Sequence, residues 1–464
     1  MKKVFLAILI VLFASAAWAE VKFELSGNAH ARGNYWKNFS QLTPYSDYES
    51  ESYTDYDGDV NLYPKISVGD TSLNMKIAIR DETWGAVDRD DLEVNTNPDT
   101  NSVYNSYTGS KDDNINIERA WIQHKFSENT TLDVGLMDGQ VWATTFGDYL
   151  MGRYRVKITQ KTPFGVVGAL VEKDAELGTS EKDAEKDDYD SYALFAVTKA
   201  GDVYIKPLIF YVYNGGWNKI KTEFNIGPAG DADIAFSTID YGNDALTVLY
   251  LALGFDGKLG PIEFESELGY KKYDAEGSIV VVNDNNPLVS AGTPLSTFDN
   301  DWITWGAYLN VWKTLDGMRP GLTLAYGSYD EEGGPAKNGV GGGWDNRDDF
   351  CSNLILGDWV AWGDNAGNDE DIVGMTLIKP YIADVKLADK LSASASFGYI
   401  MSNQKDNEYE DATAMEVDLG IAYSITDNLV YSVDAGYADI SYDVAGIEDP
   451  DAIMLVQHKI KFSF

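Results

Sequence analysis

Apolar and polar residues alternate one by one along many short segments of this chain. Met415, Val417 and Leu419, for example, alternate with Glu416 and Asp418. Successive side chains of a β-strand point to opposite faces of its sheet, so this period of two predicts strands with one apolar and one polar face.

Eighteen segments carry such a strand-like pattern. We predict strands at 22–36, 60–68, 71–81, 115–126, 130–139, 152–161, 165–172, 190–199, 202–214, 245–256, 260–272, 302–313, 319–329, 371–386, 390–402, 412–425, 428–442 and 452–464. Pro64, Pro207 and Pro380 fall inside these segments. Because proline removes a ladder donor, we expect a bulge or a misplaced strand at each of the three.

The connections between the predicted strands are alternately short and long. The short ones are rich in Gly, Asn, Asp and Pro, as hairpin turns are, and lie at 69–70, 127–129, 162–164, 200–201, 257–259, 315–318, 387–389 and 426–427. The others are mostly long and polar, at 37–59, 82–114, 214–244, 273–301 and 330–370. This alternation with an even strand number is typical of transmembrane β-barrels with short periplasmic turns and long extracellular loops. The pattern therefore predicts an all-β, transmembrane antiparallel β-barrel of eighteen strands, with sixteen as the alternative count. A large soluble β-sandwich is the competing fold, but it would not explain the loop lengths.

A barrel of this size turns its apolar face to lipid and encloses an aqueous lumen, so the polar faces should line that lumen. The predicted inward basic residues lie in the first third of the chain: Arg32, Lys65, Lys76, Arg80, Arg119, Lys125, Arg153, Arg155 and Lys157. The predicted inward acidic residues lie later: Glu263, Glu265, Glu267, Glu416, Asp418 and Asp434. Some of the basic residues could instead neutralise carboxylates or lie at the ends of the lumen.

The last predicted strand ends on an aromatic residue, Phe464, with Phe462 and Ile460 on the same face. This resembles the closing strand of Gram-negative outer-membrane β-barrels, in which the terminal Phe belongs to the assembly signal. His458 departs from the pattern, because it occupies the face that should meet lipid.

The first residues have the pattern of a secretory signal peptide. Lys2 and Lys3 precede an apolar run that is too short to span a bilayer as a helix, and Ala17 and Ala19 fit the cleavage rule. We expect 1–19 to be a signal peptide and 20–464 to be a single barrel domain; an uncleaved anchor is the alternative.

Composition narrows the classes of function. The chain carries 36 Lys and Arg against 74 Asp and Glu, a formal charge of −38, which argues against binding nucleic acid. Its 29 Tyr and 12 Trp suit a protein that meets two membrane–water interfaces. Cys351 is the single cysteine, so no intramolecular disulfide can form.

A basic wall opposite acidic residues resembles the constriction of Gram-negative porins. In that family the third extracellular loop often folds into the lumen and supplies acids. The matching position is 141–152, with Asp148 after a Phe-Gly pair, and the Gly-rich loop 333–343 could take this role instead. The resemblance implies a water-filled channel for small hydrophilic solutes or ions, without cofactor. It also implies a homotrimer in the cell outer membrane, in contact with lipid and lipopolysaccharide and inserted by the barrel-assembly machinery.

Two other functions compete with that of a channel. A barrel enzyme is disfavoured because His30, His124 and His458 form no close-spaced cluster, although sequence alone does not exclude contact in space. An adhesin or surface-structural barrel that works through its long acidic loops is the main alternative. If the chain is a channel, we expect the basic wall and the acids that face it to govern ion permeation. Charges in the exposed loops act only within about 8 Å at physiological salt.

Overall fold

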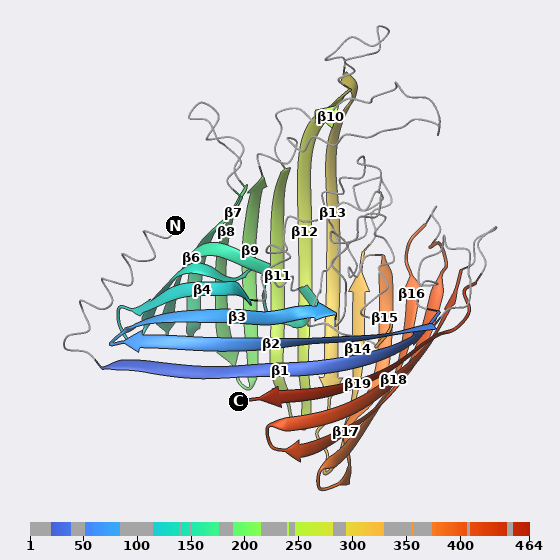
Figure 1. Ribbon diagram of the computed structural model, residues 1–464. Helices are drawn as coiled ribbons and strands as arrows, with labels where there is room; N and C mark the ends of the chain where they lie inside the picture. The colour runs from blue at the N-terminus through green and yellow to red at the C-terminus, as the bar shows by residue number, and fades with distance from the viewer. Residues whose placement is uncertain are drawn as a thin grey trace, which may run out of the picture.

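The computed structural model of the chain describes residues 20–38, 52–83, 115–139, 141–147, 151–175, 189–214, 239–240, 246–281, 294–328, 354–356, 374–405, 409–442 and 449–464. These residues form one antiparallel sheet that closes on itself, as Figure 1 shows. The predicted signal peptide, 1–19, lies outside the described residues and stays a prediction.

Eighteen long strands make the wall. They are β1 (Val21–Lys37), β2 (Ser52–Val68), β3 (Thr71–Thr83), β4 (Ile115–Lys125), β5 (Thr130–Gly139), β6 (Met151–Thr162), β7 (Gly165–Ala175), β8 (Tyr189–Ala200), β9 (Val203–Asn214), β11 (Leu246–Leu259), β12 (Ile262–Val281), β13 (Pro294–Trp312), β14 (Arg319–Gly327), β15 (Met375–Ala388), β16 (Leu391–Ser402), β17 (Thr413–Thr426), β18 (Leu429–Ser441) and β19 (Ile453–Ser463). The two-residue strand β10 (Ile239–Asp240) pairs with the far end of β12.

Each wall strand pairs with the next along the chain, β9 pairs with β11, and β1 pairs with β19 to close the barrel. The prediction of eighteen strands is confirmed, and the alternative count of sixteen is wrong. Strands β2, β12 and β13 run further toward the long-loop end than the apolar pattern indicated. In Figure 1, β12 and β13 rise together above their neighbours.

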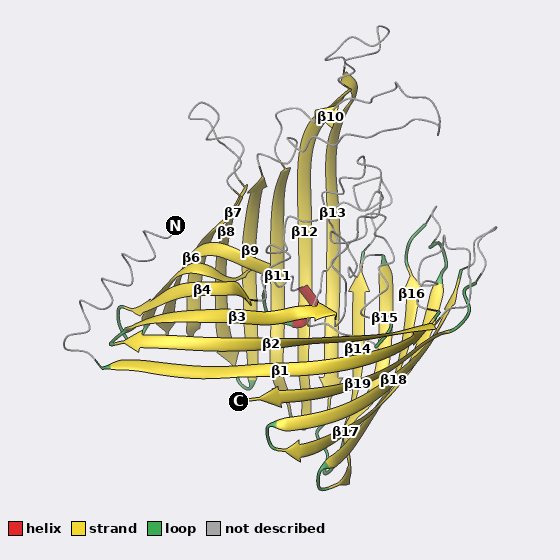
Figure 2. Ribbon diagram, in the orientation of Figure 1, coloured by secondary structure: helices red, strands yellow, loops and turns green. Residues whose placement is uncertain are grey.

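The described part contains almost no helix. Its one helical element is the short 3-10 turn η2 (Thr145–Gly147), drawn red inside the ring of strands in Figure 2. None of the described helical residues forms a helix long and apolar enough to cross a membrane.

The three prolines are accommodated without the expected bulges or strand shifts. Pro64 pairs with Leu25, Pro207 with Leu253 and Pro380 with Leu322 on one side. On the other side the ladder skips the proline and resumes in the same register. A single missing N–H donor therefore interrupts one ladder locally, because neighbouring pairs hold the register.

The wall has one apolar and one polar face. Exposed apolar side chains such as Leu194, Leu268 and Leu419, each at least half exposed, lie at alternate positions on the outside. The intervening positions point inward, where Glu267 and Asp418 contact chain segments that lie inside the ring. Alternation along each strand thus separates the two environments, as the sequence pattern predicted.

The barrel closes at a tight seam between the first and last strands. The Gly27 N–H donates to the Phe464 carbonyl (2.9 Å), and the Phe464 N–H donates to the Gly27 carbonyl (3.0 Å). The Phe464 ring covers Gly27, where a Cβ would lie 2.7 Å from ring carbon Cζ. On the same outer face, His458 packs edge-on against Tyr56 at 6.0 Å between ring centroids. Tyr56 and Tyr431 thus flank the one imidazole that broke the apolar pattern of this strand.

Candidate functional site: the lumenal face

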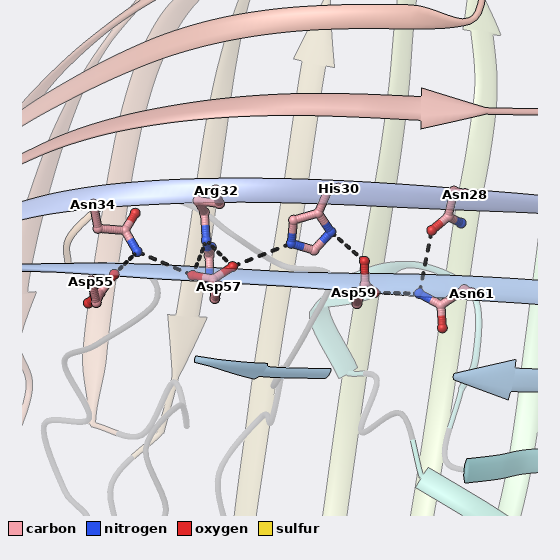
Figure 3. A network of polar contacts seen from close by, with 8 residues as sticks. All are labelled: Asn28, His30, Arg32, Asn34, Asp55, Asp57, Asp59 and Asn61. Carbon is pink, nitrogen blue, oxygen red and sulfur yellow. Dashed lines mark hydrogen bonds and ion pairs between the residues drawn. The ribbon is translucent and has the colours of Figure 1, made fainter. Parts of the chain in front are cut away.

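Strands β1 and β2 present a ladder of polar side chains to the lumen, shown in Figure 3. Arg32 Nε donates to both carboxylate oxygens of Asp57, at 3.0 and 2.8 Å. His30 Nδ1 lies 2.5 Å from Asp59 and its Nε2 lies 3.5 Å from Asp57. Asn34 Nδ2 extends the ladder by donating to Asp55 (2.6 Å). Arg32 is therefore held by carboxylates of the neighbouring strand.

Most of the other predicted basic residues are also paired with acids. The pairs with one carboxylate are Lys76–Glu118 (2.6 Å), Arg119–Asp138 (2.5 Å) and Lys157–Asp133 (3.4 Å). The inward prediction is wrong for Arg119, because Asp138 and Gly152, which its guanidinium contacts, face the outside beyond the β4 bulge. Glu118 stands at a bulge in β4, opposite Lys76, and Asp133 lies beside Lys157 in the β5–β6 register. These basic residues therefore neutralise carboxylates, which was the alternative that the sequence left open.

Arg153 and Arg155 share one buried carboxylate, Glu172 of β7. Glu172 is 0% exposed, contacts the Arg155 guanidinium directly, and has an oxygen 3.9 Å from Arg153 Nε. The Arg153 guanidinium also lies over the ring of Tyr189, 5.7 Å from its centroid. These two arginines are therefore fixed against the wall.

The remaining predicted basic residues are less constrained. Lys65 and Lys125 take part in no ion pair with another residue of the described ranges, and both stand at positions of the inward face. Arg80 lies in β3 beyond a bulge, and its side chain is outside the described part.

The segment 141–147, which follows β5, folds into the lumen and docks on the opposite wall. The Trp142 indole N–H donates to the Lys206 carbonyl (3.0 Å), and Lys206 Nζ donates to the Ala143 carbonyl (3.1 Å). Phe146 is 0% exposed and stacks on Tyr308 of β13 at 5.5 Å. Docking is close, since a Cβ at Gly254 would lie 2.2 Å from the Cβ of Ala143. The β5–β6 connection, the third at the end of the barrel that carries the long loops, therefore enters the lumen although it is short.

The two loops predicted to narrow the channel, 141–152 and 333–343, lie partly or wholly outside the described residues. Asp148, one residue past the inward segment, lies outside the described residues, as does the Gly-rich loop 333–343. The next described part of that long connection, 354–356, also lies against the inner wall. The backbone N–H groups of Ile355 and Leu356 donate to Glu416 at 2.6 and 2.7 Å.

Two predicted lumenal acids therefore serve as anchors for these segments. Glu267 accepts hydrogen bonds from the Thr144 N–H (3.0 Å), the Thr144 hydroxyl (2.7 Å) and the Tyr250 hydroxyl (3.1 Å). Glu267 and Glu416 are 0% and 1% exposed. Both point inward as expected, but chain segments rather than lumen water cover them.

A pocket of about 430 Å³ opens between the two inward segments and strands β12 to β18. Thr145 and Leu354 contribute from the segments. The wall contributes the acids Glu265, Asp418 and Asp434, the bases Arg319 and Lys379, and the polar side chains Tyr308, Asn310, Thr323, Tyr381, Ser394 and Ser396. The sixth predicted acid, Glu263, lies outside this pocket near the turn end, bonded to Thr314 (2.9 Å) and Lys258 (3.1 Å).

The described residues offer no arrangement for a metal ion, because no three of their His, Cys, Asp and Glu side chains converge on one point. His30 faces the lumen within the polar ladder. His124 and His458 lie on the outer face, where His124 Nδ1 is 2.9 Å from the Thr71 hydroxyl.

Sequence reasoning missed several residues that shape the lumen. It did not single out the acidic partners Asp57, Glu118, Asp133 and Glu172, because their pairing depends on strand register. It also missed the inward turn at 354–356, for which the run Leu354, Ile355 and Leu356 inside a polar loop is the available signal.

No protein-family model and no curated protein matches the chain. Solved structures with a similar overall shape include the outer membrane protein OpdK from Pseudomonas aeruginosa (8% identity, 95% of this chain and 98% of that chain, TM-score 0.48). They also include the outer membrane channel DcaP of Acinetobacter baumannii (12%, 96% and 97%, TM-score 0.43) and an anion-selective porin from Comamonas acidovorans (9%, 96% and 100%, TM-score 0.42). At these identities and scores the likeness carries no information about what this chain transports or binds.

Proposed function

We propose that the chain is an outer-membrane porin, a water-filled channel for the passive diffusion of small hydrophilic solutes. The observation that carries the proposal is the closed eighteen-strand wall with an apolar outside and a charged inside. A wall that exposes so many large apolar side chains would be poorly soluble, whereas in a bilayer that face meets lipid. Barrels of this strand number are too wide for their own side chains to fill.

The two inward segments indicate that the channel is narrowed and not a fully open tube. Segments 141–147 and 354–356 are each held by a buried glutamate and by an apolar side chain, Phe146 or Ile355, that is 0% exposed. Several independent contacts fix each segment, so solutes would pass beside them rather than displace them. The polar pocket beside the segments is then part of the path.

The proposal extends to location and assembly. Cleavage before Glu20 would leave a chain that begins at β1, and the Phe464 seam would complete the barrel during insertion by the assembly machinery. Deletion of Phe464 removes two backbone hydrogen bonds and the ring over Gly27. It should therefore lower the yield of heat-modifiable barrel. We also propose a homotrimer. Finding a monomer in native detergent extracts would refute the trimer but not the channel.

Liposome swelling tests the central part of the proposal. Purified protein in vesicles should admit uncharged sugars at rates that fall with their size. Vesicles that stay impermeable to all sugars, although the protein in them is folded and heat-modifiable, would favour the adhesin or surface-structural alternative.

A further inference from the structure

The charges of the lumenal wall are compensated on one side and not on the other. On β1 to β7, Arg32, Lys76, Arg155 and Lys157 each form an ion pair with a carboxylate. On β12, β17 and β18, the pocket acids Glu265, Asp418 and Asp434 form no ion pair with any residue that the structure describes. The basic wall is thus largely neutralised by its own neighbours, while these three acids are not.

The hydrogen-bond donors to Glu265 and Asp418 are neutral groups. Glu265 accepts from the Tyr308 hydroxyl (2.7 Å) and from Asn310 Nδ2 (3.2 Å). Asp418 accepts from the Ser396 hydroxyl (3.0 Å) and weakly from the Leu354 N–H (3.4 Å). Such bonds fix the carboxylates in place but leave their negative charge.

The carboxylate of Asp434 lies close to that of Asp418 and to the ammonium group of Lys459 on β19. It accepts from the Ser432 hydroxyl at 3.3 Å, a long bond. The Oδ1 atom of Asp418 is buried, and the carboxyl group of Asp418 lies beside that of Glu416. Carboxyl groups therefore gather on this side of the pocket.

The bases beside the pocket do not restore neutrality. Arg319 donates to Asp384 at 2.8 Å, so that guanidinium is already matched by a carboxylate. Lys379 lines the pocket and Lys459 lies near Asp434, so two ammonium groups stand against three carboxylates. The pocket as a whole is negative.

We infer that this pocket makes the channel cation-preferring, and that the solutes it favours are small organic molecules with an ammonium group. The inference deepens the proposed function and rests on it. The volume, about 430 Å³, is in the range of ligand pockets. Carboxylates on β12 and on β17 and β18 would attract the ammonium group, while the hydroxyls of Tyr308 and Tyr381 and the amide of Asn310 suit hydroxyl groups on the same solute.

The size of the effect follows from the Coulomb interaction in a water-filled passage. An ion about 7 Å from one carboxylate in water at physiological salt should gain roughly two- to threefold in the ratio of cation to anion permeability. Removal of all three charges should therefore lower that ratio by roughly tenfold or more if the contributions multiply.

Zero-current potentials in planar bilayers test this inference. Gradients of KCl, glucosamine hydrochloride and sodium glucuronate would be compared for the unmodified protein and for a Glu265→Gln, Asp418→Asn and Asp434→Asn triple variant. The unmodified protein should prefer K⁺ over Cl⁻ and glucosamine over glucuronate, and the triple variant should lose most of both preferences. The matched control is Glu263→Gln, two residues from Glu265 on the same face but outside the pocket, which should change the ratio much less.

The outcomes separate the two proposals. Absence of any current and of glucose-driven swelling would remove the channel itself. A conducting channel that prefers anions, or a triple variant with the unmodified permeability ratio, would overturn the inference and leave the channel intact. If the triple variant does not fold, the single variants Glu265→Gln and Asp434→Asn serve in its place, each with a two- to threefold expected change.

Discussion

Substitution of Phe146 by Ala should loosen the inward segment 141–147 without opening the barrel wall. Phe146 is 0% exposed and stacks almost parallel on Tyr308, with 8° between the ring planes. It takes no part in the strand ladders, which end at Gly139 and resume at Met151. The loss should therefore fall on docking of the segment rather than on folding of the barrel.

The magnitude can be worked from this environment. Replacing a fully buried Phe by Ala costs about 3–5 kcal/mol in protein cores. At about 1.4 kcal/mol for each factor of ten, a loss of about 3 kcal/mol shifts the docking equilibrium by roughly 150-fold. The two hydrogen bonds from Thr144 to Glu267 remain, so we expect a segment that undocks intermittently.

Single-channel recording is the appropriate assay. The Phe146→Ala protein should show a higher mean conductance with frequent current steps. The control is Phe164→Ala, the same change at a residue that is 82% exposed in the turn between β6 and β7. Thr144→Val, which removes the hydroxyl bond to Glu267 at 2.7 Å, should act in the same direction as Phe146→Ala. Unaltered conductance in both lumenal variants would refute the idea that 141–147 narrows the channel.

Two further changes probe the wall. Gly27→Val places carbon where the Phe464 ring and the Asn61 carbonyl both lie 2.7 Å away; barrel assembly, followed as the heat-modifiable fraction, should fall. Ala31→Val, which faces Gly58 in the same strand pair, should assemble normally, and equal yields would contradict the seam argument. Arg155→Met removes the closest cation from the fully buried Glu172, and breaking such a pair costs about 3–5 kcal/mol. Urea unfolding in detergent should show that loss against a Lys65→Met control, and equal stability would mean that Arg153 alone suffices.

The strand number and the separation of two faces could be read from the sequence because both depend on local pattern. Alternation such as that of Met415 to Leu419 needs no knowledge of neighbouring strands. The far ends of β2, β12 and β13 were missed because no regular alternation marks them: Ile279, Val280 and Val281 are consecutive in β12, and Leu295 and Phe298 stand among polar residues in β13. The prolines were misjudged for a related reason: long ladders on either side hold the register around one missing donor.

The lumen was harder to predict because its chemistry depends on which inward residues meet. Alternation put Arg155 and Lys157 on the inward face, but only the β5–β6–β7 register brings them to Glu172 and Asp133. Likewise, the inward position of Glu267 followed from the sequence. Its burial beneath Thr144 depends on a loop crossing the lumen, a contact between residues 123 positions apart.

Ion current through single molecules in a planar bilayer tests the central claim most directly. A water-filled channel should give discrete, voltage-independent steps whose conductance rises in proportion to the bulk conductivity of the electrolyte. Addition of folded, heat-modifiable protein that yields no steps at any salt concentration would contradict the account.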